Sequence, residues 1–210
     1  MKDIVIYGAG GFGRETALLI HQINQHTSAW NLIGFYDDGL AKGKSVDSWK
    51  VLGGIDDLIK SGGQVSIVIA IADPITRKLL IEKLNNIPLD FPTLIHPLCQ
   101  RGDKNNYFGK GCVLTAGVIL TTSISFEDFV IVNLLSTIGH DVVIGKFSTV
   151  MPGCSISGSV KIGECSLIGT GARILQNLSI GKKSRVGAGA VVTQSFPDGQ
   201  TILGIPAYAK

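Results

Sequence analysis

Large apolar residues recur at every sixth position over the C-terminal half of the chain. Counting in sixes from residue 108 to residue 192 gives fifteen positions, and each holds a large apolar side chain. A six-residue period places three short strands in every turn, which predicts a hexapeptide parallel β-helix of about five coils. The fifteen residues expected to face inward are Phe108, Leu114, Leu120, Phe126, Val132, Ile138, Ile144, Val150, Ile156, Ile162, Ile168, Ile174, Ile180, Val186 and Val192.

Small residues recur with the same six-residue period. The residue two places before many of the apolar sites is small or branched, as at Ser136, Cys154 and Ala190, which suits a narrow interior. Glycine directly follows seven of the fifteen sites. We expect these glycines to turn the corners of the helix, as Gly139 would after Ile138. The segment 196–210 breaks the period and is expected to cap the solenoid.

The first 95 residues follow a different pattern, in which short apolar runs alternate with segments of helical spacing. The runs at 3–10, 31–38 and 64–71 predict strands, and 13–24 and 74–86 predict helices. This order is typical of a Rossmann-like, parallel βαβαβ unit. Its length matches one mononucleotide-binding half of a doubly wound sheet, and is too short for the two halves that hold a dinucleotide.

We therefore expect an α/β domain at residues 1–95 and an all-β domain with its cap at residues 96–210. The net charge of +3 is small and the basic residues are scattered, so no nucleic-acid groove is indicated. The four cysteines show no metal-ligand spacing with histidine, which favours a reducing cytoplasm and no metal site. No apolar run approaches the roughly 18 to 20 residues that cross a bilayer, so we expect no membrane insertion.

A histidine and an aspartate stand side by side within the hexapeptide repeats. With Ile138 facing inward, His140 and Asp141 are expected to face outward. A carboxylate beside an imidazole can hold it in one tautomer, which a general base requires. The alternative is a surface histidine without a chemical role. Cys165 also falls at an outward repeat position, where we expect a tolerated surface or interface thiol rather than a covalent relay.

A glycine-rich segment, GAGGFG at residues 8–13, follows the first predicted strand and opens the first predicted helix. It satisfies the dinucleotide pattern G-x-G-x-x-G, and Asp37 and Asp38 end the second strand. Because the domain is half-sized, we expect no NAD. Glycines and a helix N-terminus still suit a phosphate group. The alternative is tight packing of strand and helix with no ligand.

Five short motifs together resemble one group of bacterial enzymes. They are IYGAGGFGRE at 6–15, FYDD at 35–38, LIHP at 94–97, IGHDVVIG at 138–145 and GIPA at 204–207. The chain resembles, essentially from end to end, the bacterial sugar acetyltransferases grouped around sialic-acid O-acetyltransferase and the UDP-4-amino-sugar N-acetyltransferases of bacillosamine synthesis. The resemblance implies a left-handed β-helix and a homotrimer with active sites between neighbouring subunits.

The resemblance also implies roles for residues of the repeat domain. His140 would remove a proton from the acceptor amine or hydroxyl as it attacks the thioester of acetyl-CoA, and Asp141 would orient it. Asn133 would lie close to the acceptor group. Acetyl-CoA would contact the backbone at Gly158, Thr170 and Ala188. One departure concerns Thr149, which stands where the bacillosamine enzymes carry a second histidine.

In the N-terminal domain the resemblance implies a nucleotide-sugar site. Gly11, Phe12 and Gly13 would lie near the phosphates, and Asp37 or Asp38 would accept a hydrogen bond from the base. Phe12 departs from the histidine that is frequent in the family. Arg77 would pair with phosphate, or would lie on a solvated helix face.

The function expected from these features is acetyl transfer from acetyl-CoA to the amino group of a nucleotide-linked sugar. The transfer would be direct, with no acetyl-enzyme intermediate. Two alternatives stay open. One is O-acetylation of a sialic acid or another sugar hydroxyl, and the other is a scaffold that binds a sugar nucleotide without turnover.

Overall fold

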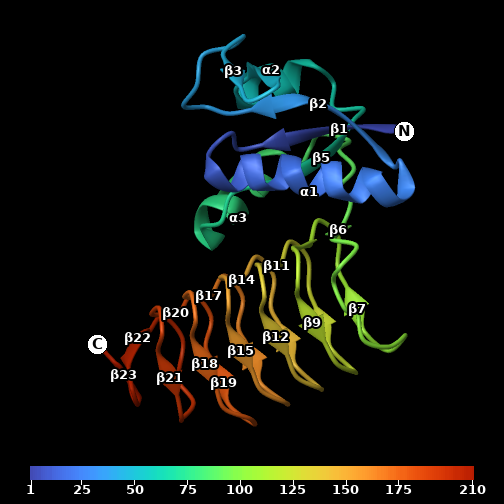
Figure 1. Cartoon of the computed structure of the whole chain (residues 1–210). Coiled ribbons are helices and arrows are strands. Elements are labelled where there is room, and N and C mark those ends of the chain that lie inside the picture. The colour runs from blue at the N-terminus through green and yellow to red at the C-terminus, as the bar shows by residue number, and fades with distance from the viewer. The chain divides into compact units, whose positions relative to one another are not determined.

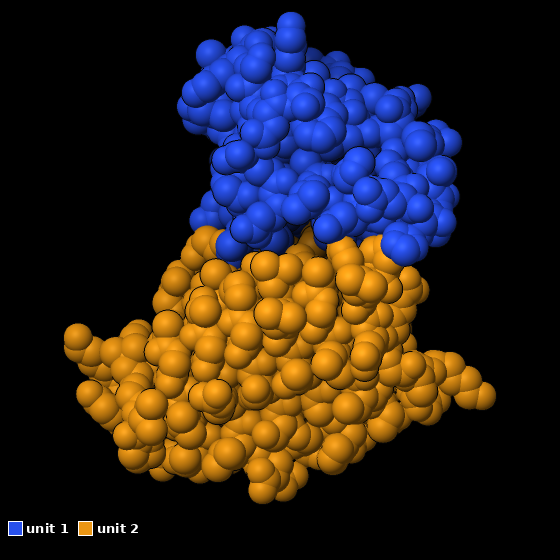
Figure 2. Space-filling model, in the orientation of Figure 1, with its two compact units in different colours: residues 1–72, 76–94 blue, residues 73–75, 95–210 orange.

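The computed structural model describes all residues from 1 to 210 and divides into two compact units. Unit 1 comprises residues 1–72 and 76–94, and unit 2 comprises residues 73–75 and 95–210 (Figure 2). No helix is long and apolar enough to cross a membrane.

Unit 1 is built around a mostly parallel sheet with the strand order β3-β4-β2-β1-β5 (Figure 1). Its core joins the inner faces of β1, β2 and β5 to α2 and α3, through residues such as Val5, Ile67 and Leu80. The elements are β1 Lys2–Tyr7, α1 Gly11–Thr27, β2 Trp30–Tyr36, β3 Ser45–Val46, β4 Trp49–Gly53, α2 Ile55–Lys60, β5 Ser66–Ile69 and α3 Pro74–Lys83. The Rossmann-like arrangement is confirmed, with a further parallel strand, β4, its hairpin partner β3 and the short helix α2 added to the predicted set.

The strand order reverses at β1, because β2 pairs with one of its sides and β5 with the other. Ligands of open α/β sheets bind beyond the carboxyl ends of the strands at such a point. The glycine-rich segment leaves β1 there. Gly8 has a φ of +102°, and a Cβ on Gly13 would lie 1.9 Å from the Gly8 carbonyl oxygen, so glycine is required at both positions.

Unit 2 is a parallel β-helix of two-residue strands whose coils contain three strands each (Figure 1). We name its three faces after one strand of each. The β13 face holds β7, β10, β13, β16 and β19, and the β12 face holds β9, β12, β15, β18 and β21. The β14 face holds β8, β11, β14, β17 and β20 and is extended by β6 at one end and by β22 and β23 at the other.

The strands from β7 to β21 follow the predicted six-residue period without interruption, and β6, β22 and β23 lie outside it. They are β6 Leu94–Ile95, β7 Tyr107–Phe108, β8 Val113–Leu114, β9 Ile119–Leu120, β10 Ser125–Phe126, β11 Ile131–Val132, β12 Thr137–Ile138, β13 Val143–Ile144, β14 Thr149–Val150, β15 Ser155–Ile156, β16 Lys161–Ile162, β17 Leu167–Ile168, β18 Arg173–Ile174, β19 Ser179–Ile180, β20 Arg185–Val186, β21 Val191–Val192, β22 Thr201–Gly204 and β23 Ala207–Ala209. Each strand from β7 to β18 pairs with the strand 18 residues later, as Val143 does with Lys161.

The predicted inward residues form one continuous core. Fourteen of the fifteen are buried and Phe108 packs against them half-buried. The small residues two places earlier also point inward, and Ser136, Cys154 and Ala190 are at most 1% exposed. Ile202 and Ala207 of the C-terminal hairpin join the same core, so this segment closes the end of the β-helix as expected.

The corners are turned by different residues from those expected. Backbone with positive φ recurs at every sixth position from Gly111 to Gly189, three residues after each inward side chain, and nine of these fourteen corners are not glycine. Asp141, with a φ of 59°, therefore turns the chain, and the expectation for Gly139 is wrong. Glycine is needed at Gly139 for another reason, because a Cβ there would lie 2.7 Å from the Gly158 backbone nitrogen in the next coil.

These two classes of glycine predict different costs of substitution. A Cβ on Gly163 would lie 2.5 Å from the backbone nitrogen of Lys182, whereas a Cβ on the corner residue Gly171 meets nothing within 4 Å. We expect Gly163→Ala to lower the free energy of unfolding by about 1–3 kcal/mol through overpacking. Gly171→Asn should change it by less than about 1 kcal/mol, because asparagine tolerates positive φ. Denaturant titrations of both variants measure the difference, and equal costs would contradict this assignment.

Candidate active site

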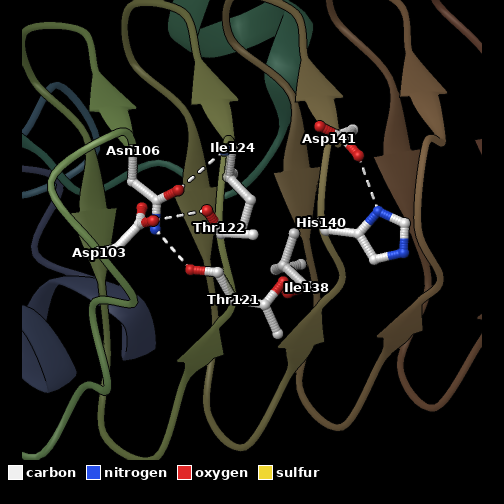
Figure 3. Close-up of polar contacts among 8 residues, drawn as sticks. All are labelled: Asp103, Asn106, Thr121, Thr122, Ile124, Ile138, His140 and Asp141. Carbon is white, nitrogen blue, oxygen red and sulfur yellow. Dashed lines mark hydrogen bonds and ion pairs between the residues drawn. The ribbon is translucent and has the colours of Figure 1, made fainter.

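His140 lies on the edge where the β12 face turns into the β13 face, which we call the His140 edge. Its side chain is 61% exposed and that of Asp141 is 59% exposed, so both face outward as predicted. His140 Nδ1 lies 2.8 Å from Asp141 Oδ2 (Figure 3). A carboxylate only accepts hydrogen bonds, so Nδ1 carries the proton and Nε2 of the neutral ring keeps its lone pair. The pair is arranged as a general base requires.

Gly158 provides the space for the imidazole ring. It follows His140 by one coil, and a Cβ at Gly158 would lie 2.5 Å from both Cε1 and Nε2 of His140. The missing side chain therefore lets the ring lie along the edge with its basic nitrogen over the next coil. His140 is also held by its backbone, since the Ser159 amide donates to its carbonyl oxygen at 2.7 Å.

The other side of the His140 edge is braced by a loop that the sequence analysis did not single out. The Asp141 amide donates to the Thr122 carbonyl at 3.1 Å, and the Thr122 hydroxyl donates to Asp103 Oδ2 at 2.6 Å (Figure 3). The Thr122 hydroxyl, together with bonds from Asn105, lowers the pKa of the Asp103 carboxyl. Asn106 donates to the Thr121 carbonyl at 3.0 Å and accepts from the Ile124 amide at 2.8 Å. The spacing of 18 residues between Thr122 and His140 is the signal that could have identified this neighbour.

The other residues expected near the substrates in this unit lie on a second edge. Asn133 sits where the β14 face turns into the β12 face, and Thr170 and Ala188 lie along the same edge, which we call the Asn133 edge. Asn133 is buried, and its side-chain oxygen accepts from the Leu134 amide at 2.7 Å. The β12 face separates the two edges, so a single chain does not bring Asn133, Thr170 and Ala188 together with His140.

Two of the glycines in unit 1 leave open space at the start of α1. A Cβ on Gly10 or Gly11 would meet nothing within 4 Å. Gly10 provides no side-chain cap, and no acidic residue lies in the first turn of the helix. Unlike Gly8 and Gly13, these positions do not need glycine for packing. The amide groups of Gly11, Phe12 and Gly13 form this uncapped helix start.

Both aspartates at the end of β2 are already bonded within unit 1. Asp37 accepts from the Ala9 amide and the Gly39 amide, each at 2.8 Å. Asp38 accepts from the Tyr7 hydroxyl and the Ile55 amide, each at 2.7 Å. Burial and the hydrogen bond to Asp38 raise the pKa of Tyr7, so it stays a donor. Asp37 thereby fixes the glycine-rich segment, a contact that sequence reading did not predict.

Arg77 lies in α3 and is 1% exposed, so the alternative of a solvated helix face is wrong. Its guanidinium group donates to the backbone carbonyls of Ile71 and Ala72 in the loop after β5.

Thr149, which stands where the bacillosamine enzymes carry a second histidine, is fully buried in β14 of unit 2. No group of three or more histidine, cysteine, aspartate or glutamate side chains is placed to hold a metal ion.

Cys165 is 3% exposed, so the expected surface thiol is wrong. It turns a corner where the preceding coils carry Phe147 and Phe129, whose rings stack at 5.3 Å and are themselves buried. This corner is shielded rather than open. The Cys165 thiol is therefore not accessible as a nucleophile for covalent catalysis.

The burial of all four cysteines predicts their reactivity. Burial raises the pKa of Cys99 and of Cys154 to about 11, and only the thiolate attacks a disulfide reagent. Native protein at pH 8 should release less than one equivalent of chromophore from an aromatic disulfide within minutes. All four thiols should react after denaturation in guanidinium chloride. Fast reaction of one native thiol would contradict the burial.

Comparison with known proteins identifies both parts of the chain. Residues 3–84 match the model of the PglD N-terminal domain, and residues 159–194 match the hexapeptide repeat of succinyl-transferase. The GDP-perosamine N-acetyltransferase of Escherichia coli O157:H7 is 34% identical over 154 residues, which cover 73% of this chain and 69% of the relative. The chain belongs to the bacterial sugar acetyltransferases.

Solved structures of this family match the chain over its full length. The acetyltransferase domain of PglB from Neisseria gonorrhoeae in complex with acetyl coenzyme A is 32% identical with a TM-score of 0.90, covering 100% of this chain and 99% of that one. PerB from Caulobacter crescentus in complex with CoA and GDP-perosamine is 26% identical with a TM-score of 0.87, covering 100% and 98%. As a bacterial sugar acetyltransferase, the protein is an acyltransferase.

Proposed function

We propose that this sugar acetyltransferase transfers the acetyl group of acetyl-CoA to the amino group of a nucleotide-linked amino sugar. The observation that carries the proposal is the exposed His140–Asp141 pair, with Nε2 unblocked over Gly158, in a chain of this family. The relative from Escherichia coli is a GDP-perosamine N-acetyltransferase, and the matched PerB structure contains CoA and GDP-perosamine. These relatives support an amino group as the acceptor.

The chemistry follows from the positions of the two ring nitrogens. The lone pair of the acceptor nitrogen attacks the thioester carbon, and His140 Nε2 takes the proton that this nitrogen loses. Asp141 accepts from Nδ1–H throughout and stabilises the imidazolium that forms. Backbone amides at the glycine of the next coil are candidates to donate to the oxyanion. The intermediate then expels CoA as the thiolate, which takes the proton from His140 Nε2 and restores the neutral imidazole, so no acetyl-enzyme is needed.

We infer that the site is completed by a second subunit. His140 and Gly158 lie on one edge of the β-helix, whereas Asn133, Thr170 and Ala188 lie on another. In a homotrimer the His140 edge of one subunit would meet the Asn133 edge of its neighbour. The third edge favours solvent, because charges alternate along it at intervals of 18 residues, at Lys110, Asp128, Lys146, Glu164 and Lys182.

The glycine-rich start of α1 is the proposed site for the nucleotide part of the acceptor. Packing explains Gly8 and Gly13, whereas the open space at Gly10 and Gly11 suits a phosphate group close to the backbone. Gly11, Phe12 and Gly13 would contact the phosphates, and Asp37 and Asp38 would hold the surrounding loops and accept from the base. Arg77 remains a predicted phosphate partner. We place the reaction in the cytoplasm, where four free thiols persist.

The proposal is tested by measuring CoA thiol release from acetyl-CoA with a panel of acceptors. The panel contains GDP- and UDP-linked 4-amino sugars, the same nucleotides linked to sugars without an amine, and free sialic acid. We expect rapid release only with the amino sugars. Release with sialic acid or another hydroxyl acceptor alone would favour O-acetylation, and no release with any acceptor would favour a scaffold without turnover.

A further inference from the structure

Asn133 carries a hydrogen-bond donor that no group of the chain uses. The residue follows β11 on the Asn133 edge and is 5% exposed. Its Oδ1 accepts from the Leu134 amide at 2.7 Å and from the Thr115 hydroxyl at 3.3 Å, whereas its Nδ2 has no partner. Every side-chain nitrogen or oxygen that the fold seals from solvent does have a partner. Nδ2 therefore opens to the surface, as a donor on a side chain that is otherwise buried.

Two donors determine which way the Asn133 carboxamide faces. A backbone amide only donates, so the atom beside the Leu134 amide is the oxygen. The Thr115 hydroxyl donates to the same oxygen from the preceding coil. If the carboxamide turned over, its NH2 group would face both donors and both hydrogen bonds would be lost. Together the two contacts hold Nδ2 outward.

The hydroxyl of Thr115 is not needed for the backbone pairing of its coil. Thr115 is 7% exposed. The Val132 carbonyl, which lies 3.5 Å from the hydroxyl, already accepts from the Thr115 amide at 3.1 Å. The hydrogen bond between the two coils is therefore complete without the side chain, and the hydroxyl serves Asn133.

The β-helix does not require this pair of side chains. Residues 18 apart stack in successive coils, and the column that holds Thr115 and Asn133 continues with Met151, Gly169 and Gly187. None of these three offers a strong hydrogen-bonding side chain, yet their coils keep the same parallel pairing. The contact between threonine and asparagine therefore favours a task at the surface over a task in folding.

We propose that Thr115 is a positioning residue, which holds the Asn133 carboxamide so that Nδ2 donates to an oxygen of the acceptor sugar. This inference rests on the proposed function, which puts Asn133 beside the acceptor. The group that Nδ2 contacts must offer a lone pair. An ammonium has none, and a hydrogen bond to the lone pair of the neutral amine would oppose its attack on the thioester, so a sugar oxygen is the partner. Thr115 contacts Oδ1 and acts only through Asn133.

A double-mutant cycle tests the link between the two residues. Wild type, Thr115→Val, Asn133→Ala and the double variant are compared by CoA release, with the nucleotide-linked 4-amino sugar as the varied substrate. We expect Thr115→Val to raise the KM for this sugar by about three- to tenfold, the worth of one neutral hydrogen bond. The kcat and the KM for acetyl-CoA should stay within about twofold of wild type. In the Asn133→Ala protein, adding Thr115→Val should change kcat/KM by less than about twofold.

Two further variants separate the hydroxyl from packing. Thr115→Ser keeps the hydroxyl and loses a methyl group, and should bind the acceptor as wild type does. Thr27→Val is the matched control, because it removes a threonine hydroxyl that donates to the Ile23 carbonyl at 3.2 Å in α1. It should leave the KM for the sugar unchanged. The Tm of Thr115→Val should match that of wild type, since the Val132 carbonyl and Asn133 Oδ1 both keep a backbone donor.

An equal loss from Thr115→Val with and without Asn133, or no loss when Asn133 is present, would overturn the role of Thr115 while leaving the proposed function in place. A Thr115→Ser protein with the KM of Thr115→Val would overturn it as well. A rise confined to the KM for acetyl-CoA would overturn the contact with the sugar. Absence of turnover by the wild type with every amino sugar would overturn the proposed function, and with it this assignment.

Discussion

Replacing His140 with alanine is expected to lower kcat for acetyl transfer by about 100- to 10,000-fold, the usual contribution of a general base. The variant keeps the fold, because the imidazole is exposed and contributes nothing to the core. The KM for acetyl-CoA should change little, since the lost group acts on the acceptor proton. Steady-state CoA release at saturating acceptor measures the effect.

The control for this variant is His26→Ala, which removes an exposed histidine from the end of α1 and should leave kcat unchanged. Asp141→Asn should give a smaller loss than His140→Ala, because the ring keeps its basic nitrogen and loses only its orienting carboxylate. A His140→Ala protein that transfers acetyl at the wild-type rate would remove His140 from the mechanism. Loss of the native thermal transition in that variant would instead indicate a structural role.

Truncating Ile144 to alanine is expected to have the largest effect on stability. Ile144 is fully buried in the coil that carries His140, whereas its neighbour Val143 faces outward and is 36% exposed. We expect Ile144→Ala to lower the free energy of unfolding by about 2–5 kcal/mol through lost burial and a cavity. Val143→Ala should change it by less than about 0.5 kcal/mol.

Urea titrations of Ile144→Ala and Val143→Ala under the same conditions provide the comparison. The two residues are adjacent in sequence, similar in size and in the same strand, so the difference isolates which side of the sheet each occupies. Similar losses in both variants would contradict the inward assignment of every sixth residue.

The β-helix could be predicted from the sequence because one requirement repeats. Each coil must point one apolar side chain inward from each of its three faces, so apolar residues recur at fifteen evenly spaced positions. The N-terminal unit offers no such repetition. Its strand β4 has the sequence WKVLG, and β3 is two residues long, so neither shows a period long enough to detect. Their pairing depends on contacts with β2 that are distant in sequence.

Errors in the prediction arose where three-dimensional packing decides what a residue does. The period shows which residues face inward, but the left-handed backbone falls at Asp141 rather than at Gly139, whose constraint comes from a coil 18 residues away. The sequence alone allowed Arg77 to lie on a solvated helix face, but its guanidinium group donates a hydrogen bond to the Ile71 carbonyl in the loop after β5. Cys165 occupies an outward repeat position that is nevertheless buried.

The candidate site was only partly accessible to sequence reasoning. The outward direction of His140 and Asp141 follows from the repeat, because Ile138 must face inward. The space that Gly158 provides could also be found, since an 18-residue step from His140 reaches it. The hydrogen bond from Thr122 to Asp103 could not, because the loop that carries Asp103 lies outside the regular repeat.

The central claim is that acetyl transfer takes place at His140 Nε2. The most direct measurement is a crystal structure of the His140→Asn protein with CoA and a nucleotide-linked amino sugar. When the histidine side chain is placed back at position 140 in that structure, the account predicts a distance of about 2.6–3.2 Å between its Nε2 and the sugar nitrogen. It also predicts that the CoA sulfur lies beside the same nitrogen, next to Gly158. A sugar nitrogen bound away from the His140 edge, with CoA present, would contradict the account.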